Sequence, residues 1–185
     1  MHSPPLAAAV LPRSVGSMTD TSITPATDDD RAQITEIVKS AKIGLLTTVN
    51  ETGQLVSRPL AAQDVDFDGD LWFFTQDPSA KVDDIRVNPS VNVAFESKKG
   101  YLSVAGSATV VHDPAKVDEL WSPSVSAWFP DGKDDPSVAL LRVSAETVEL
   151  WVTDSPAPVV LFKVAKAAVT GGQPDIGENR TVSFE

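Results

Sequence analysis

The sequence contains no cysteine, and only two of its 185 residues are histidine. Without cysteine, a disulfide framework, a thiolate nucleophile and Cys-ligated zinc or iron–sulfur sites are excluded. Because His2 and His112 are the only imidazoles, a His-rich metal centre and most Ser-His-Asp triads are excluded as well. No apolar run approaches the roughly 18 residues of a membrane-spanning helix. We therefore expect a cytoplasmic protein without metal or thiol chemistry.

Positive charge is also scarce. Lys and Arg total 15 against 26 Asp and Glu, which gives a net charge of −11. This balance argues against non-specific binding of DNA or RNA, and it leaves room for a local basic pocket. Hydrophobic residues at 42% and charged residues at 22% are typical of a globular protein. The length fits a single domain.

The first residues are rich in Ala, Pro, Ser and Thr. A second methionine, Met18, opens a polar N-terminus, so residues 1–17 are interpreted as a leader or an overextended start. Leu6–Leu11 superficially resembles a signal-peptide core but has no preceding Lys or Arg, and secretion stays as the alternative. We expect residues 1–27 to be a disordered leader and residues 28–185 to form the domain.

Beyond the leader, the pattern predicts strands with short helices between them. Thr27 can cap a helix whose apolar residues, Ile34, Ile37, Val38 and Ala41, follow helical spacing. Strands are expected at 45–49, 54–59, 70–75, 91–95, 101–112, 139–143 and 147–153, with 181–184 a further candidate, and further helices at 81–88, 114–121 and 159–169.

Turn signals join most of these strands. Asp68-Gly69 predicts a hairpin between 54–59 and 70–75, and Gly106 predicts a β-bulge. Residues 122–136 are expected to form a long loop. The predicted fold is mainly β with peripheral α: six or seven largely antiparallel strands in a small barrel with short outer helices.

Two basic residues are candidates for an anion site. Ser79 and Lys81 stand at the start of a predicted helix, where free N–H groups and the helix dipole favour an anion. Arg58 ends a strand before Pro59, and a guanidinium can bind phosphate with two hydrogen bonds. The alternatives are a capped helix with a solvated lysine and a surface arginine in an ion pair. The predicted hairpin would bring Arg58 and Lys81 to one phosphate.

Two tryptophans are candidates for stacking on a planar ligand. Trp121 ends a predicted helix and Trp128 lies in the loop after it. The alternative is that both anchor the core or a dimer interface. His112 is interpreted as a structural turn residue, and the acids of 131–135 have the wrong spacing for a calcium loop.

Several motifs, in their order along the chain, carry a family resemblance that runs from about Asp29 to Phe184. They are Ser57-Arg58-Pro59, Leu71-Trp72-Phe73-Phe74-Thr75 with Ser79 and Lys81, Pro89, Glu119-Leu120-Trp121, Ala127-Trp128-Phe129-Pro130, Asp134-Asp135-Pro136, Leu140-Leu141-Arg142-Val143, and Lys166-Ala167 with Thr170-Gly171. This set resembles the pyridoxamine 5′-phosphate oxidase-like superfamily of flavin-binding split barrels, and within it the general stress protein group.

The resemblance implies a homodimeric split barrel with flavin mononucleotide (FMN), possibly FAD, at the subunit interface. It implies that Ser79 and Lys81 hold the phosphate and that Arg58 reaches the phosphate or the pyrimidine side of the ring. It also implies that Trp121 and Trp128 lie over the pocket. The implied cofactor-binding residues are Arg58, Pro59, Leu60, Phe73, Phe74, Thr75, Ser79, Lys81, Tyr101, Trp121 and Trp128.

The chain departs from the pattern at two places. The Arg-x-His element of the oxidases proper is reduced to Arg180, so oxidation of vitamin B6 is not expected, and Ala80 replaces a second basic residue beside Lys81. No catalytic residue and no metal ligand is predicted, since a flavin carries the electrons itself. The expected function is a stress-related flavin oxidoreductase with an unidentified small-molecule electron donor or acceptor. A flavin reservoir or sensor and a deazaflavin-dependent reductase of the same fold are the alternatives.

Overall fold

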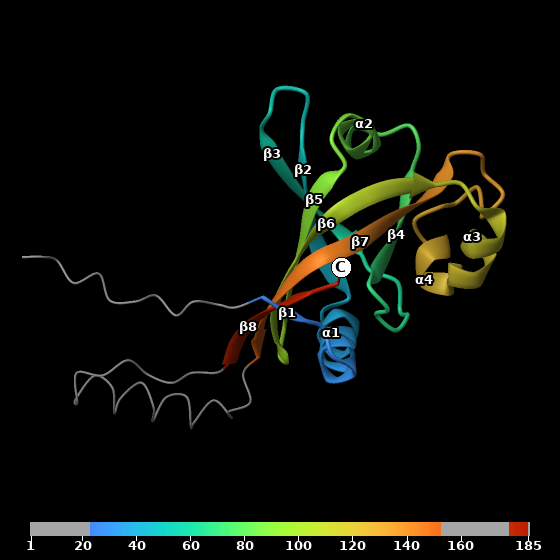
Figure 1. Ribbon diagram of the computed structural model, residues 1–185. Helices are drawn as coiled ribbons and strands as arrows, with labels where there is room; N and C mark the ends of the chain where they lie inside the picture. The colour runs from blue at the N-terminus through green and yellow to red at the C-terminus, as the bar shows by residue number, and fades with distance from the viewer. Residues whose placement is uncertain (1–22, 153–177, 185) are drawn as a thin grey trace, which may run out of the picture.

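The structure is a computed structural model that describes residues 23–152 and 178–184 (Figure 1). The first 22 residues of the expected leader and the helix predicted at 159–169 lie outside the described residues. Thr24–Pro25 form a short strand, β1, where the sequence predicted the end of the leader, and they pair with Val182 and Ser183. In the described part of the chain, no helix is long and apolar enough to cross a membrane.

Helix α1 (Asp28–Ala41) begins as the sequence predicts. The Thr27 hydroxyl accepts a hydrogen bond from Asp30 N at 3.2 Å, and the Asp30 carboxylate accepts one from Thr27 N at 2.9 Å. This reciprocal capping box satisfies two N–H groups that a helix start would otherwise leave unpaired. Ile34 and Ile37 are buried in the main hydrophobic core, so α1 packs its apolar face on the sheet.

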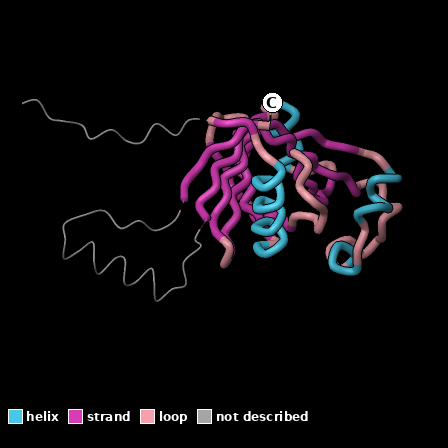
Figure 2. The backbone as a smooth tube through the Cα atoms, turned by 60° about the horizontal axis from the view of Figure 1, so that its bottom comes forward, coloured by secondary structure: helices cyan, strands magenta, loops and turns pink. Residues whose placement is uncertain are grey.

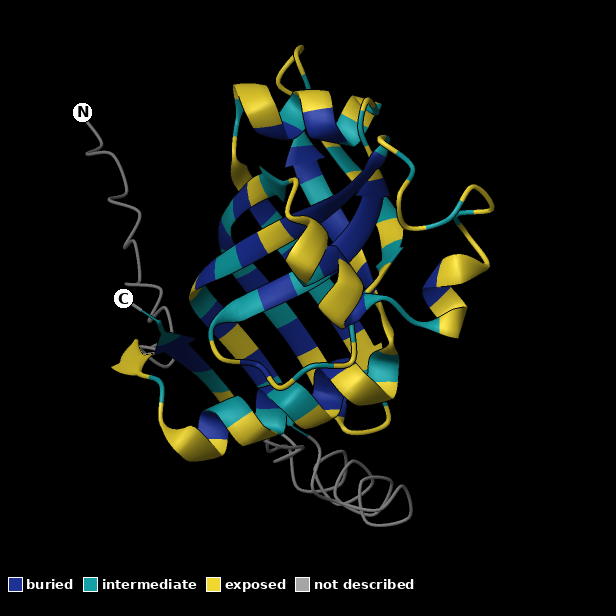
Figure 3. Ribbon diagram, turned by 90° about the vertical axis from the view of Figure 1, so that its right-hand side faces the viewer, coloured by how far each residue is buried: buried dark blue, intermediate teal, exposed yellow. Residues whose placement is uncertain are grey.

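The sheet is antiparallel except at its β1–β8 edge. Its order is β1-β8-β7-β6-β5-β2-β3, and β4 pairs with β7 off this path. The strands after β1 are β2 (Ile43–Val49), β3 (Leu55–Ala61), β4 (Asp70–Gln76), β5 (Ser90–Ser97), β6 (Gly100–Val111), β7 (Val138–Val152) and β8 (Glu178–Ser183). Along β2, β5 and β6, buried residues alternate with more exposed ones, so one face of each of these strands packs in the core. Figure 3 colours the strands by this burial. The prediction of a mainly β, largely antiparallel fold is confirmed.

Strand β7 replaces the two strands that the sequence predicted at 139–143 and 147–153. Its 15 residues are continuous because both halves pair with the same neighbour, β6. On its other edge, Val138–Ser144 pair with β4 and Thr147–Val152 pair with β8. The register shifts at Ala105/Gly106, which confirms the predicted bulge. A Cβ atom on Gly106 would lie 2.0 Å from Ser144 O, so only glycine fits there.

The hairpin predicted from Asp68-Gly69 is wrong. The turn itself forms, with Gly69 at φ 122°, but β3 pairs with β2 and β4 pairs with β7. Within the described residues, the only backbone pairing between the β3 segment and β4 is the bridge between Ala62 and Phe73. The strand after the turn, β4, does not pair back on β3, because it forms a seven-residue ladder with β7 instead. In this part of the chain, the bridge is therefore the one backbone link along the β3–β4 seam.

Within the described residues, three short helices lie outside the barrel. They are α2 (Ala80–Val87), α3 (Pro114–Leu120) and α4 (Pro123–Ser126). Figures 1 and 2 show α3 and α4 together at one side, away from α1. Val117, Leu120 and Val125 from these two helices pack with Phe74 in a second, smaller core cluster. Helix α4 lies where the sequence predicted only loop, because four residues are too few to show helical periodicity.

The capping box of α1 can be tested directly. Replacing an N-cap threonine by alanine costs about 1 kcal/mol, so we expect Thr27→Ala to lower the free energy of unfolding by that amount in urea denaturation. Thr27→Ser keeps the hydroxyl and should unfold at nearly the wild-type urea concentration. Equal stability of Thr27→Ala and wild type would show that the observed cap contributes nothing.

Candidate functional site

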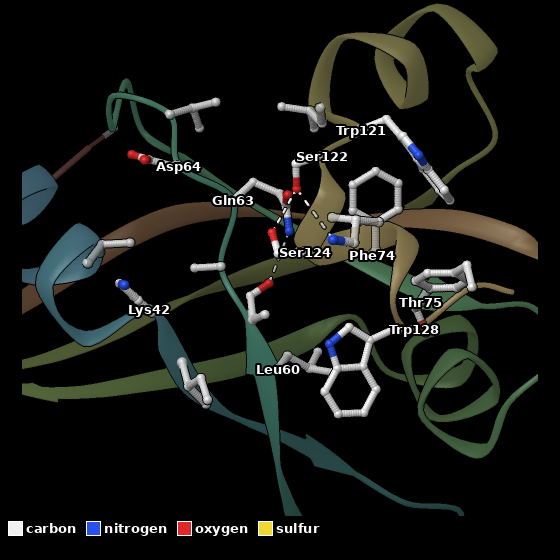
Figure 4. A pocket seen from close by; sticks show the side chains of 18 of the residues that line it. Lys42, Leu60, Gln63, Asp64, Phe74, Thr75, Trp121, Ser122, Ser124 and Trp128 are labelled. Atoms are coloured by element: carbon white, nitrogen blue, oxygen red, sulfur yellow. Dashed lines mark hydrogen bonds between the residues drawn. The ribbon is translucent and has the colours of Figure 1, made fainter. Parts of the chain in front are cut away.

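A cavity of about 920 Å³ opens along the loosely joined β3–β4 seam (Figure 4). Its volume lies at the upper end of the roughly 300–1,000 Å³ usual for small-molecule sites. Strands β3 and β4 form its floor, and the residues that follow α1 and α3 form its ends. The lining residues include Lys42, Pro59, Leu60, Ala61, Gln63, Phe74, Thr75, Lys81, Trp121, Ser122, Ser124, Trp128 and Phe129.

One wall of the cavity is aromatic. The rings of Phe74 and Trp121 meet edge-to-face, with centroids 5.5 Å apart and planes at 84°. Phe129 lies 6.0 Å from each of them. Such contacts hold aromatic rings in fixed orientations. Trp128 differs from these three, because 78% of its surface is exposed although it lines the cavity.

A lysine with no carboxylate partner among the described residues lies at the cavity. Lys81 Nζ is 3.3 Å from Ser79 Oγ, and no carboxylate oxygen of the described residues lies within 4 Å of it. Burial lowers the pKa of Lys81, and the charge of nearby Arg58 lowers it further. The Ser79 hydroxyl makes no hydrogen bond to the start of α2. A partly desolvated ammonium beside a hydroxyl that does not cap the helix can bind an anion.

Arg58 lies behind this lysine in a network of its own. Its Nη1 donates to Thr48 Oγ1 at 2.7 Å, and its Nη2 lies 3.3 Å from Asp84 Oδ2. The ion-pair alternative for Arg58 is therefore what the structure shows, although the pair is mostly buried rather than on the surface. Arg58 and Lys81 still share one neighbourhood. Helix α2 brings them together, since it carries both Lys81 and Asp84.

The loop between β4 and α2 is held in place by the carboxylate of Asp77. The Asp77 carboxylate accepts a hydrogen bond from Arg86 Nη2 at 2.6 Å and contacts His112 Nε2 at 2.8 Å. These two bonds lower the pKa of Asp77, with Arg86 the larger cause. They tie the end of β6 to the segment that presents Ser79. His112 thus contacts a loop outside the cavity.

Comparison with known proteins identifies the family. A family model described as "Pyridoxamine 5'-phosphate oxidase like" matches residues 29–175. The chain belongs to this family. Protein bli-3 of Neurospora crassa is 30% identical over 162 residues, which cover 81% of this chain and 78% of that protein. General stress protein 26 of Bacillus subtilis is 26% identical over 140 residues, which cover 72% of this chain and 96% of that one.

Solved structures of the pyridoxamine 5′-phosphate oxidase-like family show the same fold. A general stress protein 26 from Jannaschia sp. CCS1 superposes with a TM-score of 0.69 at 27% identity, covering 85% of this chain and all of that one. A protein from Xanthomonas citri, described as a general stress FMN/FAD binding protein, has a TM-score of 0.62 at 34% identity. That match covers 70% of this chain and 93% of the other.

Of the residues that the family resemblance pointed to, seven line the cavity. They are Pro59, Leu60, Phe74, Thr75, Lys81, Trp121 and Trp128. Ser79 contacts Lys81, and Arg58 lies in the Thr48–Asp84 network. Phe73 is fully buried in the main core, because adjacent residues of β4 point to opposite sides. Tyr101 does not line the cavity; it lies half exposed at the start of β6, where its hydroxyl is 3.5 Å from Glu96.

Sequence reasoning missed the polar half of the cavity, which Figure 4 shows around Lys42, Gln63, Ser122 and Ser124. Lys42 ends α1 with φ 65°, and its carbonyl accepts a hydrogen bond from Ala62 N at 2.9 Å. Nothing local in the sequence signals that long-range bond. Ser122 followed by Pro123 is a typical helix start, so that signal could have revealed α4 and its two serines.

Proposed function

We propose that this protein binds FMN in the cavity of the β3–β4 seam and acts as a stress-related flavin oxidoreductase. The observation that carries the proposal is Lys81: a partly buried ammonium without a carboxylate partner in the described residues, at a cavity with an aromatic wall. A desolvated cation without a counterion is costly, and a ligand phosphate would supply that counterion. The FMN/FAD binding described for the X. citri protein supports the same proposal.

The residues present fit each part of FMN. Lys81 and Ser79 would hold the phosphate, with Arg58 adding positive charge behind them. Leu60 and Thr75, on the facing strands, would lie along the ring and its side chain. The cavity is large enough for the nucleotide, and its apolar wall suits a planar ring. FAD contains the same phosphate next to the flavin, so Lys81, Ser79 and Arg58 could bind it in the same way.

A bound flavin supplies the electron transfer itself, so the chain needs no catalytic acid or base. The residues of this chain bind, orient and shield. Phe74, Trp121 and Phe129 exclude water from one side of the cavity. Gln63, Ser122 and Ser124 place polar groups opposite, where a small-molecule electron donor or acceptor would enter.

The phosphate contact gives the sharpest test of FMN binding. Hydrogen bonds to a charged group contribute roughly 1.5–3 kcal/mol, so Lys81→Ala should weaken FMN binding about 10- to 100-fold. Riboflavin, which has no phosphate, should bind the variant as it binds wild type. Both ligands are titrated into wild-type and variant protein by quenching of flavin fluorescence.

Lys99→Ala is the matched control for this titration. Lys99 is a remote, exposed lysine paired with Glu36, and its removal should leave both affinities unchanged. Equal losses of FMN and riboflavin affinity in Lys81→Ala would remove the phosphate role. A wild-type protein that is purified without flavin and binds neither ligand would overturn the proposed function as a whole.

Trp128 is the residue that we propose stacks on the flavin ring, because an indole that is 78% exposed gains little from packing in the chain itself. Replacing it should leave the melting temperature unchanged, whereas flavin fluorescence should respond. We expect Trp128→Phe to lengthen the fluorescence lifetime of bound flavin, since indole is the stronger electron donor. Trp128→Ala should weaken binding about 2- to 10-fold, as lost aromatic contacts do.

Trp72→Phe is the control for this pair of variants. Trp72 lies on β4 outside the cavity lining, with Lys116 Nζ 5.1 Å from its ring centroid. It should not change the flavin lifetime. If Trp128→Phe and Trp72→Phe give the same lifetime as wild type, Trp128 has no role at the ring.

We further propose that two copies of the chain pair through the outer face of β2, β3, β5 and β6. A row of apolar or small residues crosses this face in register, from Pro59 through Leu45 and Ala94 to Ser103. Leu45 is 50% exposed, and Leu55 on the same face is 75% exposed. Contiguous exposed apolar surface of this kind marks an interaction site. Pro59 also lines the cavity, so a partner seated here would adjoin the cofactor.

A charge on this face should separate the two copies. Leu45→Lys places an ammonium at the centre of the row, so we expect sedimentation equilibrium to change from twice the chain mass to the chain mass. Val87→Lys is the control, because Val87 is an exposed apolar residue of α2 outside this face. Wild-type protein that is monomeric at micromolar concentration and still binds FMN tightly would contradict the pairing.

A further inference from the structure

The network behind Lys81 contains a carboxylate that the proposed cofactor contacts do not explain. Thr48 Oγ1 donates to Asp84 Oδ2 at 2.7 Å and accepts from Arg58 Nη1 at 2.7 Å. The guanidinium also reaches Asp84 Oδ2 directly, through Nη2 at 3.3 Å. The three side chains therefore form a closed triangle around one carboxylate oxygen.

This triangle is largely removed from solvent. The side chains of Arg58 and Asp84 are 21% and 13% exposed, and Thr48 is fully buried. In the described part of the chain, Asp84 is the only carboxylate within 4 Å of the Arg58 guanidinium. Lys81 lies one helical turn before Asp84 on α2. Lys81 at the cavity and Arg58 behind it thus combine two positive charges with the one negative charge of Asp84.

We propose that Asp84 is an internal counterion for Arg58 that competes with the ligand phosphate, and that it thereby sets how strongly the site prefers phosphorylated over unphosphorylated flavin. This inference rests on the proposed binding of FMN. Asp84 acts through Arg58 and need not touch the ligand, so it is a positioning residue.

The two neighbouring positive charges favour such a group in the flavin-free protein. Arg58 and Lys81 repel each other, as the lowered pKa of Lys81 reflects, burial being its larger cause. Asp84 offsets one of these two charges while no phosphate is present. When a phosphate binds, the same carboxylate repels it and keeps part of the guanidinium engaged. The residue that stabilises the flavin-free protein therefore weakens the binding of the phosphate.

A guanidinium has five N–H donors, and the Thr48 and Asp84 contacts use two of them. The remaining donors leave Arg58 able to serve a phosphate without leaving the network. A purely structural role for Asp84, joining α2 to β2 and β3, predicts something different. Its loss would then lower stability and weaken FMN and riboflavin binding equally.

The test is Asp84→Asn, which removes the charge and keeps the shape and an acceptor oxygen. At an effective dielectric of about 20, removing one negative charge near a phosphate strengthens binding by about 3- to 30-fold. We expect this gain for FMN only, with riboflavin affinity within about two-fold of wild type. The affinities are measured by fluorescence titration, and thermal unfolding of the flavin-free protein is followed alongside.

Asp83→Asn is the matched control, because it removes the same charge one residue earlier, from an exposed position that faces Arg86. It should leave the ratio of FMN to riboflavin affinity unchanged. The double variant Arg58→Ala/Asp84→Asn tests the route. If Asp84 acts through Arg58, the gain seen with Asp84→Asn is smaller in the Arg58→Ala background, where only the direct repulsion between the carboxylate and the phosphate remains.

The outcomes separate this inference from the proposed function. FMN binding to Asp84→Asn that is equal to or weaker than wild type overturns the counterion role while leaving FMN binding intact. Absence of FMN binding in wild type overturns both. Asp84→Ala is the second variant and carries the same expectation. If neither Asp84 variant folds while Asp83→Asn does, Asp84 is structural and the inference is wrong.

Discussion

The candidate site depends on how β7 divides its hydrogen bonds. One edge of this strand pairs with β6 along its length, while the other edge pairs first with β4 and then with β8. Strand β4 is thereby drawn to β7, and β3 remains with β2. In the described residues, the seam between β3 and β4 is bridged only at Ala62–Phe73. Because no continuous backbone ladder closes the seam, side chains from its two sides line a cavity there.

The distribution of charge in this acidic chain leaves one positively charged site, at Lys81 and Arg58. Most of the basic side chains that form ion pairs do so with surface carboxylates, as Lys39 does with Asp64 and Asp66. Lys81 differs because it is partly buried and has no carboxylate partner among the described residues, while Asp84 on the same helix is engaged by Arg58 and Thr48. In a chain of net charge −11, an exposed lysine would attract an anion only weakly, because solvent and salt screen the interaction between their charges.

The sequence predicted what local chemistry decides and missed what distant pairing decides. The Thr27 cap and the Gly106 bulge depend on neighbouring atoms, and both were predicted correctly. The hairpin after β3 was wrong, because the partner of β4 lies more than 60 residues along the chain. Strand β7 was divided in two, since Ala145–Glu146 interrupts its strand pattern in the sequence but not its ladder with β6.

The same distinction applies to the site. The motifs with Arg58, Phe74 and Lys81 can be recognised in the sequence, and the family resemblance implies that all three bind one cofactor. That Arg58 would be held by Thr48 and Asp84 was not visible, because the three residues lie on different elements and no spacing links them. For Arg58, an ion pair within the chain and binding of a ligand phosphate are the two alternatives that the sequence offers. The geometry makes them compatible, since two donors are used and three remain.

The proposed pairing face and the proposed cofactor cavity meet at Pro59, which belongs to both. A ligand in the cavity and a partner on the outer face would therefore act on the same short segment of β3. Each would stabilise the arrangement that the other binds, and mass action makes such coupling reciprocal. The segment is suited to this, because proline fixes its own φ and donates no hydrogen bond that a partner would have to replace.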